Sequence, residues 1–342
     1  MLRRSTVAGL ALIVSLVGTT TSEAGAVLDK VKAANTLRCG VGGSVPTFSR
    51  VDSKGEWTGL DVDYCRAVAA AVLGDPTKVT FVPLSLQQRF TALQSGEVDM
   101  LARDSVVNLT RDTSLGVMSV VTNFYTGAGF IVRRDLKIKS SDQMNNATFC
   151  ISQGNSALGT LADLMKKKNL QYKVVQLEKF QETFQAFLAG RCEAAIAGAA
   201  DLAGAQVMMA PNPADYVVLD EVMSNDPYSL YVTRGDWEWF TIVRWVHNGL
   251  VEAEVRGISQ SNVRQLAESS ADVTVKRMLG TQDDLGKLLG LNKDWLVKVI
   301  EAVGNYGEIF DRHFGAKSVL KMGRGQNDLA TRGGLMYSPP FQ

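Results

Sequence analysis

Arg111 is the residue with the strongest case for binding an anion. It lies in LARDSVVNLTRD, a few residues after an apolar run that ends near Met100. A guanidinium at a strand end can hold a carboxylate through two parallel charge-assisted hydrogen bonds, and the alternative is a solvated surface arginine. In QGNSALGTLADLMKK, residues 154–156 stand at the start of a helix, whose free backbone N–H groups also favour an anion. One carboxylate could therefore be held between the two segments.

Residue types that perform covalent or metal chemistry are sparse. The only histidines, His247 and His313, lie far from any cysteine or carboxylate cluster at metal-ligand spacing. Asp61 and Asp63 come closest to a catalytic carboxylate pair, but Asp63 precedes a helical run, where capping is the commoner role. The glycines of CGVGGS lack the full spacing of a phosphate loop, so we interpret them as a ligand wall. We predict no enzymatic activity, no metal and no cofactor.

The first residues are typical of an export signal. Arg3 and Arg4 precede a short apolar run, and small residues then approach a possible cleavage site at residues 24–26. We predict that residues 1–26 are a cleaved signal peptide and that the mature protein is periplasmic. No cysteine follows the run, so we expect no lipid anchor.

Composition excludes several classes of partner. Removing residues 1–26 deletes two of the 36 basic and one of the 35 acidic residues, which leaves no net charge. Neither nucleic acid nor an anionic membrane is therefore expected as a partner. With 46% apolar residues the chain can bury a large core, and its length favours two domains.

The four cysteines are expected to form disulfides in an oxidising compartment. Cys39 ends a strand-like run, and Cys65 opens the helix-like DYCRAVAAAVLG. Cys150 and Cys192 stand at matching places further on. We therefore predict the pairs Cys39–Cys65 and Cys150–Cys192.

A near-repeat indicates the organisation of the fold. KVTFVPLSLQQRFTALQSGEVDMLA resembles YKVVQLEKFQETFQAFLAGRCEAAIAG, with Phe90 aligned to Phe184 and Gly96 to Gly190. Each copy has the pattern of a strand, a helix that ends at glycine, and a second strand. Each is therefore a βαβ unit on a parallel sheet, and two copies predict two similar α/β lobes.

The chain is expected to cross between these lobes twice. Strand-like stretches at 129–134 and 229–233 bracket the second copy of the repeat. The predicted lobe one takes residues 27–130 and 232–342, and the predicted lobe two takes residues 131–231.

The carboxyl ends of the predicted strands give the place of the binding site. Ligands of open α/β sheets sit beyond these ends. The corresponding segments follow Cys39, Met100, Cys150 and Ile196. A solute held between all four would touch both lobes and close them about the two crossings.

These segments together resemble the family 3 solute-binding proteins of polar amino-acid ABC transporters, and specifically the general amino-acid-binding branch. The resemblance covers essentially the whole mature chain. It rests on PTFSRVDSKGEWTGLDVDYCRAVAAAVLGD, RFTALQSGEVD, LTRDTSLG, FYTGAGFIVR, GRCEA, VGNYGEIFDRHFG and GGLMYSPP. The resemblance implies a type II periplasmic-binding-protein fold with two hinge strands and extra C-terminal helices on lobe one. It also implies a protein that captures an L-amino acid and delivers it to a membrane permease, and we expect a monomer.

The family pattern assigns the candidate ligand-binding residues. Arg111 falls on the carboxylate-binding arginine, and Phe48 on the aromatic wall. Asn155 and Ser156 match the polar helix start that closes over the carboxylate. The remaining candidates at the strand ends are Arg103, Asp104, Ser105 and Gly198.

The α-amino side of the predicted pocket departs from the family pattern. Gly198 stands where the family has an aspartate that neutralises the ammonium, and Val106 replaces a hydroxyl residue. We expect Asp201, one helical turn later, to point elsewhere. Burying an ammonium without partners costs roughly several kcal/mol. Asp104 could supply the substitute carboxylate, or it is solvated or paired with Arg103.

Two ligand hypotheses follow. In the first, Asp104 compensates, and the ligand is an amino acid or a close derivative such as a small peptide or opine. In the second, Gly198 and Val106 make a more apolar pocket for a carboxylate that lacks a free α-amine. Two other functional classes remain: a dehydratase-like enzyme with Asp104 as the acid, and a sensor module that presents closed lobes to a membrane partner.

Overall fold

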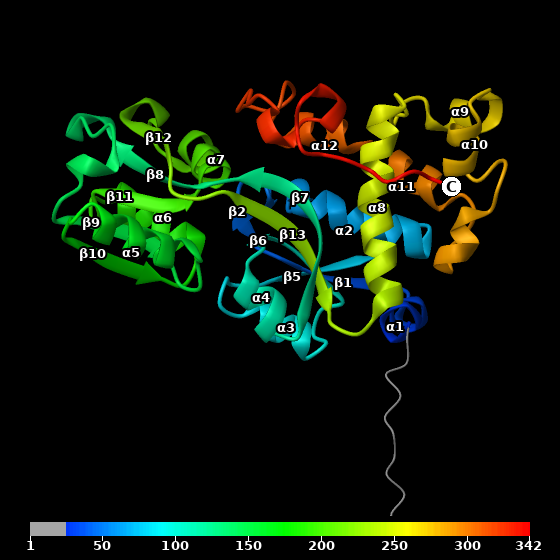
Figure 1. Ribbon diagram of the computed structural model, residues 1–342, viewed down its shortest axis with the longest axis horizontal. Coiled ribbons are helices and arrows are strands. Elements are labelled where there is room, and N and C mark those ends of the chain that lie inside the picture. Colours follow the sequence, from blue (N-terminus) through cyan, green and yellow to red (C-terminus); the bar gives the residue numbers. More distant parts are fainter. Residues whose placement is uncertain (1–24) are drawn as a thin grey trace, which may run out of the picture.

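The protein consists of two α/β lobes, each built on one five-stranded sheet, and a group of helices packed against the first lobe (Figure 1). The computed structural model describes residues 25–342. The predicted signal peptide, residues 1–26, lies almost entirely outside the described residues. No helix of the described chain is long and apolar enough to cross a membrane.

The first lobe is built on a mixed sheet of parallel and antiparallel strands. Its sheet has the order β5 (Val79–Pro83), β1 (Leu37–Val41), β6 (Met100–Val106), β13 (Asp226–Thr233) and β7 (Val117–Thr126). Strand β1 pairs in parallel with β5 and β6, whereas β13 pairs in antiparallel fashion with β6 and β7. A small additional sheet contains β2 (Ser44–Val45), β3 (Ser49–Val51) and β4 (Trp57–Thr58).

The second lobe repeats the same arrangement. Its sheet has the order β10 (Tyr172–Leu177), β9 (Ala147–Ser152), β11 (Ala194–Gly198), β8 (Ala128–Arg133) and β12 (Tyr216–Val222). Strand β9 pairs in parallel with β10 and β11, and β8 is antiparallel to β11 and β12. The predicted α/β class with two similar lobes is confirmed.

The near-repeat in the sequence corresponds to equivalent parts of the two lobes. The first copy forms β5, α3 (Arg89–Gln94) and β6, and the second forms β10, α6 (Phe180–Leu188) and β11. Gly96 and Gly190 follow the two helices with φ angles of 71° and 76°. Glycine adopts this left-handed conformation without the steric cost of a Cβ, so it ends both helices.

The chain crosses between the two sheets at Gly127 and at residues 223–225. A Cβ at Gly127 would overlap the carbonyl oxygen of Ser224, so the two crossings lie against each other. Of the stretches expected to bracket the second copy, 129–134 covers most of β8 and the first residue of η1 (Arg134–Leu136), and 229–233 lies within β13. The division into residues 27–130 with 232–342 and residues 131–231 stays a prediction. The sheets themselves change at 126–128 and 222–226.

The C-terminal helices pack against the first lobe, on the side away from the second lobe (Figure 1). They are α8 (Trp237–Val255), α9 (Val263–Ser269), α10 (Val273–Met278), α11 (Trp295–Val303) and α12 (Tyr306–His313). Helices α8 and α11 both contact α2 (Leu60–Leu73). Apolar residues at three- and four-residue spacing on α8, among them Trp239, Val243 and Val246, are fully buried in this contact region.

An ion-pair cluster fastens the last helix to this lobe. Oδ2 of Asp63 accepts hydrogen bonds from Nε and Nη2 of Arg312 at 3.1 and 2.7 Å, and it lies 2.6 Å from Nε2 of His313. The predicted capping role of Asp63 is wrong, because α2 already begins at Leu60 and Asp63 lies in its first turn.

Both predicted disulfides are confirmed. Cys39 on β1 bonds to Cys65 on α2, and the Cα atoms are 6.0 Å apart. Cys150 on β9 bonds to Cys192, which lies between α6 and β11, and these Cα atoms are 5.7 Å apart. Each bridge therefore ties the second strand of one sheet to a neighbouring segment.

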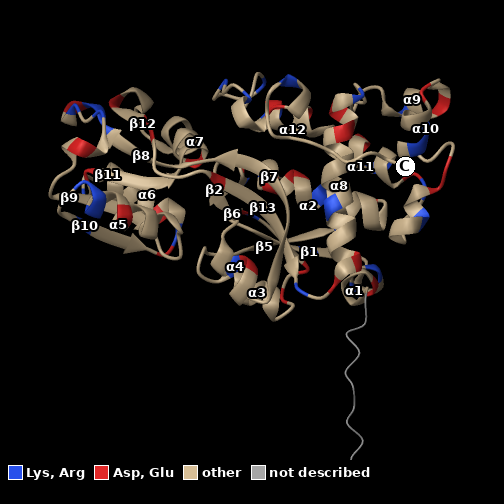
Figure 2. Cartoon of the chain, in the orientation of Figure 1, with Lys and Arg blue, Asp and Glu red and all other residues tan. Residues whose placement is uncertain are grey.

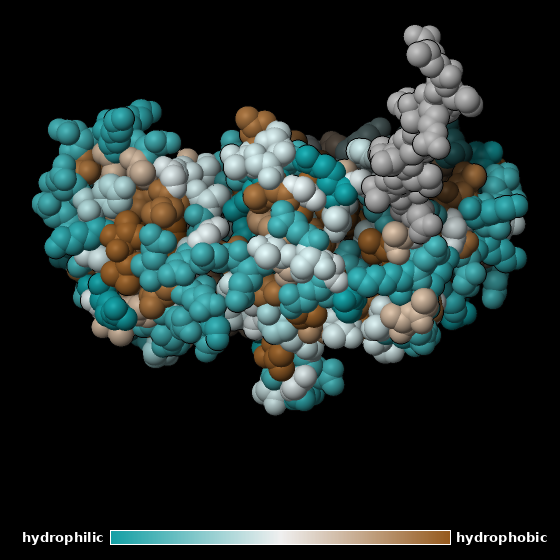
Figure 3. Space-filling view, turned by 90° about the horizontal axis from the view of Figure 1, so that it is seen from below, coloured by the Kyte–Doolittle hydropathy of each residue, from teal (hydrophilic) through white to brown (hydrophobic). Residues whose placement is uncertain are grey.

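Basic and acidic residues are both spread along the described chain, over both lobes (Figure 2). One face is mostly hydrophilic, with apolar patches on both lobes (Figure 3). This distribution agrees with the balanced charge of the sequence.

We expect the double substitution Cys150→Ser with Cys192→Ser to lower the free energy of unfolding by about 2–4 kcal/mol. The bridge spans 42 residues, so its loss frees a long loop in the unfolded chain. Urea unfolding followed by circular dichroism measures the change. An unfolding free energy equal to that of the parent protein would contradict this role.

Candidate functional site

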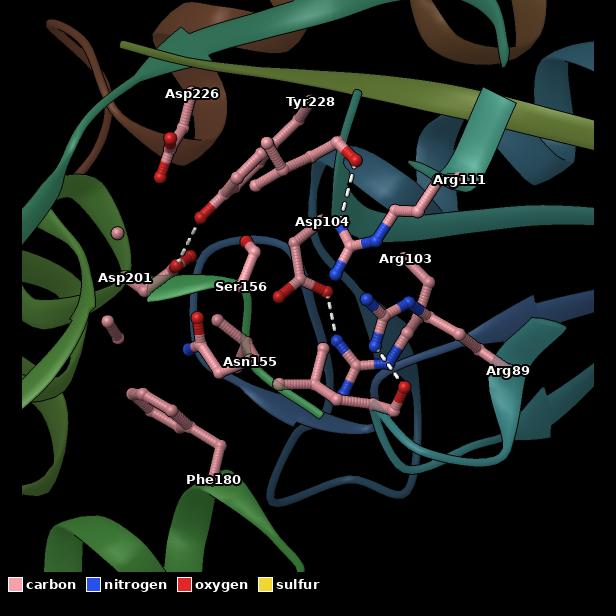
Figure 4. A pocket seen from close by; sticks show the side chains of 15 residues that line it. Arg89, Arg103, Asp104, Arg111, Asn155, Ser156, Phe180, Asp201, Asp226 and Tyr228 are labelled. Carbon is pink, nitrogen blue, oxygen red and sulfur yellow. Dashed lines mark hydrogen bonds and ion pairs between the residues drawn. The ribbon is translucent and has the colours of Figure 1, made fainter. Parts of the chain in front are cut away.

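A cavity lies between the two lobes, where the carboxyl ends of four strands meet (Figure 4). Its volume is about 440 Å³, including the opening to solvent. The four strand ends expected from the sequence all contribute to it: Val45 after β1, Val106 at the end of β6, Asn155 after β9 and Gly198 at the end of β11. The cavity is therefore placed by the topology that the two sheets share.

Two buried arginines form one side of the cavity. Arg89 is 1% exposed and Arg111 is 8% exposed. Their guanidinium carbons lie 4.6 and 5.4 Å from the centre of the same ring, Phe90. Within residues 25–342 neither guanidinium pairs with a carboxylate. Burial and the charge of Arg111 lower the pKa of Arg89 well below its usual value.

Local structure fixes the direction of both arginines. Asn108 caps α4 (Leu109–Ser114), and its Oδ1 accepts a hydrogen bond from the backbone N–H of Arg111 at 3.0 Å. Nη1 of Arg111 donates to the carbonyl oxygen of Val106 at 2.7 Å. Nη1 of Arg89 donates to the carbonyl oxygen of Leu86, while its buried Nε has no partner in the described chain. The unused donors make this side of the cavity a place for an anion.

Asp201 and Tyr228 form the opposite side. The Tyr228 hydroxyl donates to Oδ2 of Asp201 at 2.7 Å. Oδ1 of Asp201 is buried and has no hydrogen-bond partner in the described chain. The expectation that Asp201 points elsewhere is wrong, because α7 (Ala199–Met209) begins directly after β11 and its first turn lines the cavity. Burial and the charge of Asp104 raise the pKa of Asp201 well above its usual range.

Gly198 makes room for this pair. A Cβ at position 198 would overlap the Tyr228 hydroxyl and would lie 2.6 Å from Oδ2 of Asp201. An aspartate at position 198, as in the family pattern, could not share this space with Asp201 and Tyr228. The Asp201 carboxylate therefore lies close to the space that a side chain at position 198 would take.

Asp104 lines the cavity from a strained position. Its φ of 33° is left-handed, and the pairing of β6 with β13 shifts its register nearby. Such a conformation in a non-glycine residue is costly and is concentrated at functional sites. Its carboxylate pairs with Arg103, as one alternative from the sequence had it. Its backbone N–H donates to Oδ2 of buried Asp61 at 3.2 Å.

Two predicted ligand contacts do not reach the cavity. Phe48 is fully buried, and its ring packs 5.1 Å from Phe124 and Phe314 and 5.5 Å from Tyr228. Phe48 thus packs behind Tyr228, and its contact with a ligand stays a prediction. Ser105 is also fully buried, and its hydroxyl donates to the carbonyl oxygen of Arg103 at 2.6 Å. Its contact with a ligand likewise stays a prediction.

The second lobe completes the wall. Asn155 and Ser156 line the cavity just before α5 (Ala157–Lys167), where they were expected. Their contact with a ligand stays a prediction. Phe180, at the start of α6, adds an aromatic ring to the wall besides that of Tyr228. Sequence reasoning missed Phe180, Arg89 and Tyr228.

Residues 37–316 match the bacterial extracellular solute-binding proteins, family 3. The chain belongs to this family. It is 42% identical to the general L-amino acid-binding periplasmic protein AapJ of Rhizobium johnstonii, over 92% of each chain. It is also 42% identical to the glutamate/glutamine/aspartate/asparagine-binding protein BztA of Rhodobacter capsulatus, over 92% of this chain and 93% of that protein.

One solved structure is very similar to this protein. It is an ABC transporter periplasmic binding protein from Brucella ovis with glutathione bound. The two are 44% identical with a TM-score of 0.89, over 92% of this chain and 99% of that one. The predicted type II fold and the function of an ABC-importer solute-binding protein are confirmed. These relatives are binding proteins of transport systems rather than enzymes, which agrees with the prediction of no enzymatic activity.

We expect Gly198→Ala to weaken ligand binding by about tenfold or more, because the new methyl group must displace Tyr228 or Asp201. Isothermal titration calorimetry measures the change. Gly159→Ala on α5 is the matched control, since a Cβ there meets no atom within 4 Å. Equal affinities of the two variants would contradict the packing described for Gly198.

Proposed function

We propose that this solute-binding protein captures a carboxylate that carries a free α-amine, an L-amino acid or a derivative of one, and delivers it to a membrane permease. The observation that supports this choice is the arrangement of charges across the cavity. Buried guanidinium groups without a carboxylate partner face a buried carboxylate, that of Asp201, whose Oδ1 has no partner in the described chain (Figure 4).

The arginine side binds the ligand carboxylate in this proposal. A buried cation without a counter-ion is costly, and a carboxylate between Arg89 and Arg111 would relieve that cost for both. The helix start at Asn155 and Ser156 closes over the same group from the second lobe. The ligand carboxylate is thus held by both lobes, and its binding favours their closure.

The Asp201 side binds the ammonium. An ammonium has three donors, and Oδ1 of Asp201 is a buried acceptor in need of one. The Asp104 carboxylate also lines the cavity, where it is paired with the Arg103 guanidinium. An amine-free carboxylate would leave Oδ1 of Asp201 buried and unsatisfied, which costs about 1–3 kcal/mol. We therefore favour the amine-bearing ligand over the amine-free alternative.

The ligands named for the relatives agree with this class. AapJ is named for general L-amino acids, and BztA for glutamate, glutamine, aspartate and asparagine. Glutathione, bound in the Brucella ovis protein, also carries one carbon with both a free amine and a carboxylate. All these molecules offer the same head group to a site of this kind.

The other functional classes have less support. A dehydratase would need Asp104 as a free acid facing the ligand, but its carboxylate is paired with the Arg103 guanidinium. A sensor would use the same binding site and differ only in its membrane partner. We propose that the protein acts as a periplasmic monomer, after cleavage of residues 1–26 and without a lipid anchor.

Substitutions on the two sides of the cavity should separate the two head-group contacts. We expect Arg111→Met to weaken L-glutamate and its amine-free analogue glutarate alike, by roughly a hundredfold, about 3 kcal/mol. We expect Asp201→Asn to weaken L-glutamate by about tenfold or more and to leave glutarate nearly unchanged. Calorimetric titration of each ligand gives the affinities.

The exposed Arg191→Met is the matched control, and it should bind both ligands like the parent protein. Equal losses of L-glutamate and glutarate on Asp201→Asn would oppose an ammonium contact at this residue. Tighter binding of glutarate than of L-glutamate by the parent protein would favour the amine-free ligand instead.

Binding of an amine-bearing ligand should release protons. The pKa of Asp201 is raised in the free protein, and a bound ammonium lowers it by favouring the ionised carboxylate. Affinity should therefore fall on acidification through the raised pKa, before ordinary carboxyl groups titrate. Calorimetry in two buffers of different protonation enthalpy counts the protons. We expect Asp201→Asn to reduce the release, and the exposed Asp220→Asn to leave it unchanged.

A further inference from the structure

The cleft between the lobes has a second compartment. The inner compartment is the cavity described above, and the outer compartment is a larger space of about 850 Å³, including its opening to solvent. Arg103 and Phe180 line both compartments, so the two meet at these side chains. The first lobe contributes Ser44, Trp57 and Gln88 to the outer compartment, and the second contributes Glu178, Lys179 and Gln181.

The glycine loop after β1 keeps this space open. A Cβ at Gly42 would lie 3.3 Å from Cζ of Arg103, and a Cβ at Gly43 would lie 3.1 Å from Pro83. Gly43 has a φ of 77°, which side-chain-bearing residues rarely adopt. The CGVGGS segment, interpreted from the sequence as a ligand wall, thus borders the outer compartment rather than the inner one.

We propose that the outer compartment is a subsite for the side-chain arm of an amino acid that is extended through an amide bond. This inference rests on the proposed function, in which the inner compartment holds the α-amine and α-carboxylate of one carbon. A ligand held in this way can reach past Arg103 and Phe180 only through its side chain.

The chemistry of the lining fits an amide-bearing arm. Amide groups of Gln88 and Gln181 and the hydroxyl of Ser44 offer both donors and acceptors. Glu178 and Lys179 add one charge of each sign, and the half-buried Trp57 ring offers an apolar surface. An alkyl arm would leave these polar groups without new partners, whereas a peptide-like arm can bond to them. Because both lobes line this compartment, such an arm also adds contacts across the cleft.

Two isomeric dipeptides test the proposal. L-γ-glutamyl-L-alanine is linked through the side chain and keeps a free amine and carboxylate on one carbon. L-α-glutamyl-L-alanine has the same atoms and charge, but its α-carboxylate is consumed by the peptide bond. We expect the γ isomer to bind at least about tenfold more tightly than the α isomer in calorimetric titration. L-glutamate is titrated as the ligand without an arm.

Filling the outer compartment should affect only the extended ligand. We expect Ser44→Trp to weaken the γ isomer by about tenfold or more and to change L-glutamate less than twofold. The matched control, Lys54→Trp, adds the same side chain to the exposed turn between β3 and β4, and it should bind both like the parent protein. Gln181→Ala provides a milder second variant, with a smaller loss confined to the γ isomer.

Equal affinities of the two isomers would overturn the proposal. It would also be overturned if Ser44→Trp and Gln181→Ala both left the γ isomer unaffected, or weakened it no more than L-glutamate. Absence of binding by L-glutamate and by both dipeptides would contradict the head-group site itself, and with it the proposed function.

Discussion

The buried charges at the junction of the two sheets are the constraint on which the site depends. Arg89 and Arg111 are withdrawn from solvent without a carboxylate partner in the described chain, and Oδ1 of Asp201 is buried without a donor. Such groups persist only where the surrounding fold holds them firmly. Two sheets, each cross-linked to a neighbouring segment by a disulfide on an interior strand, provide that support. These unpaired buried groups destabilise the free protein. A solute of complementary charge pairs with them, and this pairing contributes to its affinity.

Much of the scaffold could be predicted because it follows from periodicity and topology. The near-repeat gave two βαβ units, and the cysteine positions gave both disulfides. The rule that ligands sit beyond strand ends led to the four segments around the cavity. These inferences need only the direction of each strand, which a pattern of apolar residues specifies.

The details of the wall could not be predicted because they depend on side-chain direction. Asp201 faces the cavity because α7 begins immediately after β11. If the helix began one residue earlier or later, the Asp201 side chain would be turned by about 100° around the helix axis. The left-handed backbone of Asp104 is equally invisible in the sequence. Phe48 was assigned to the ligand wall from its aligned position alone. In the structure its ring packs in the aromatic cluster behind Tyr228. Arg89 follows a Gln-Gln pair that gave no sign of burial.

The contact between the two chain crossings determines how the cleft changes width. Gly127 and Ser224 touch, so both connections share one short pivot, and Asp226 follows that pivot by two residues. Phe180 lies on the opposite side of the cavity from Asp226 (Figure 4). A rotation about this pivot would displace each atom in proportion to its distance from the pivot. Such a rotation would move the Phe180 rim further than the wall near Asp226.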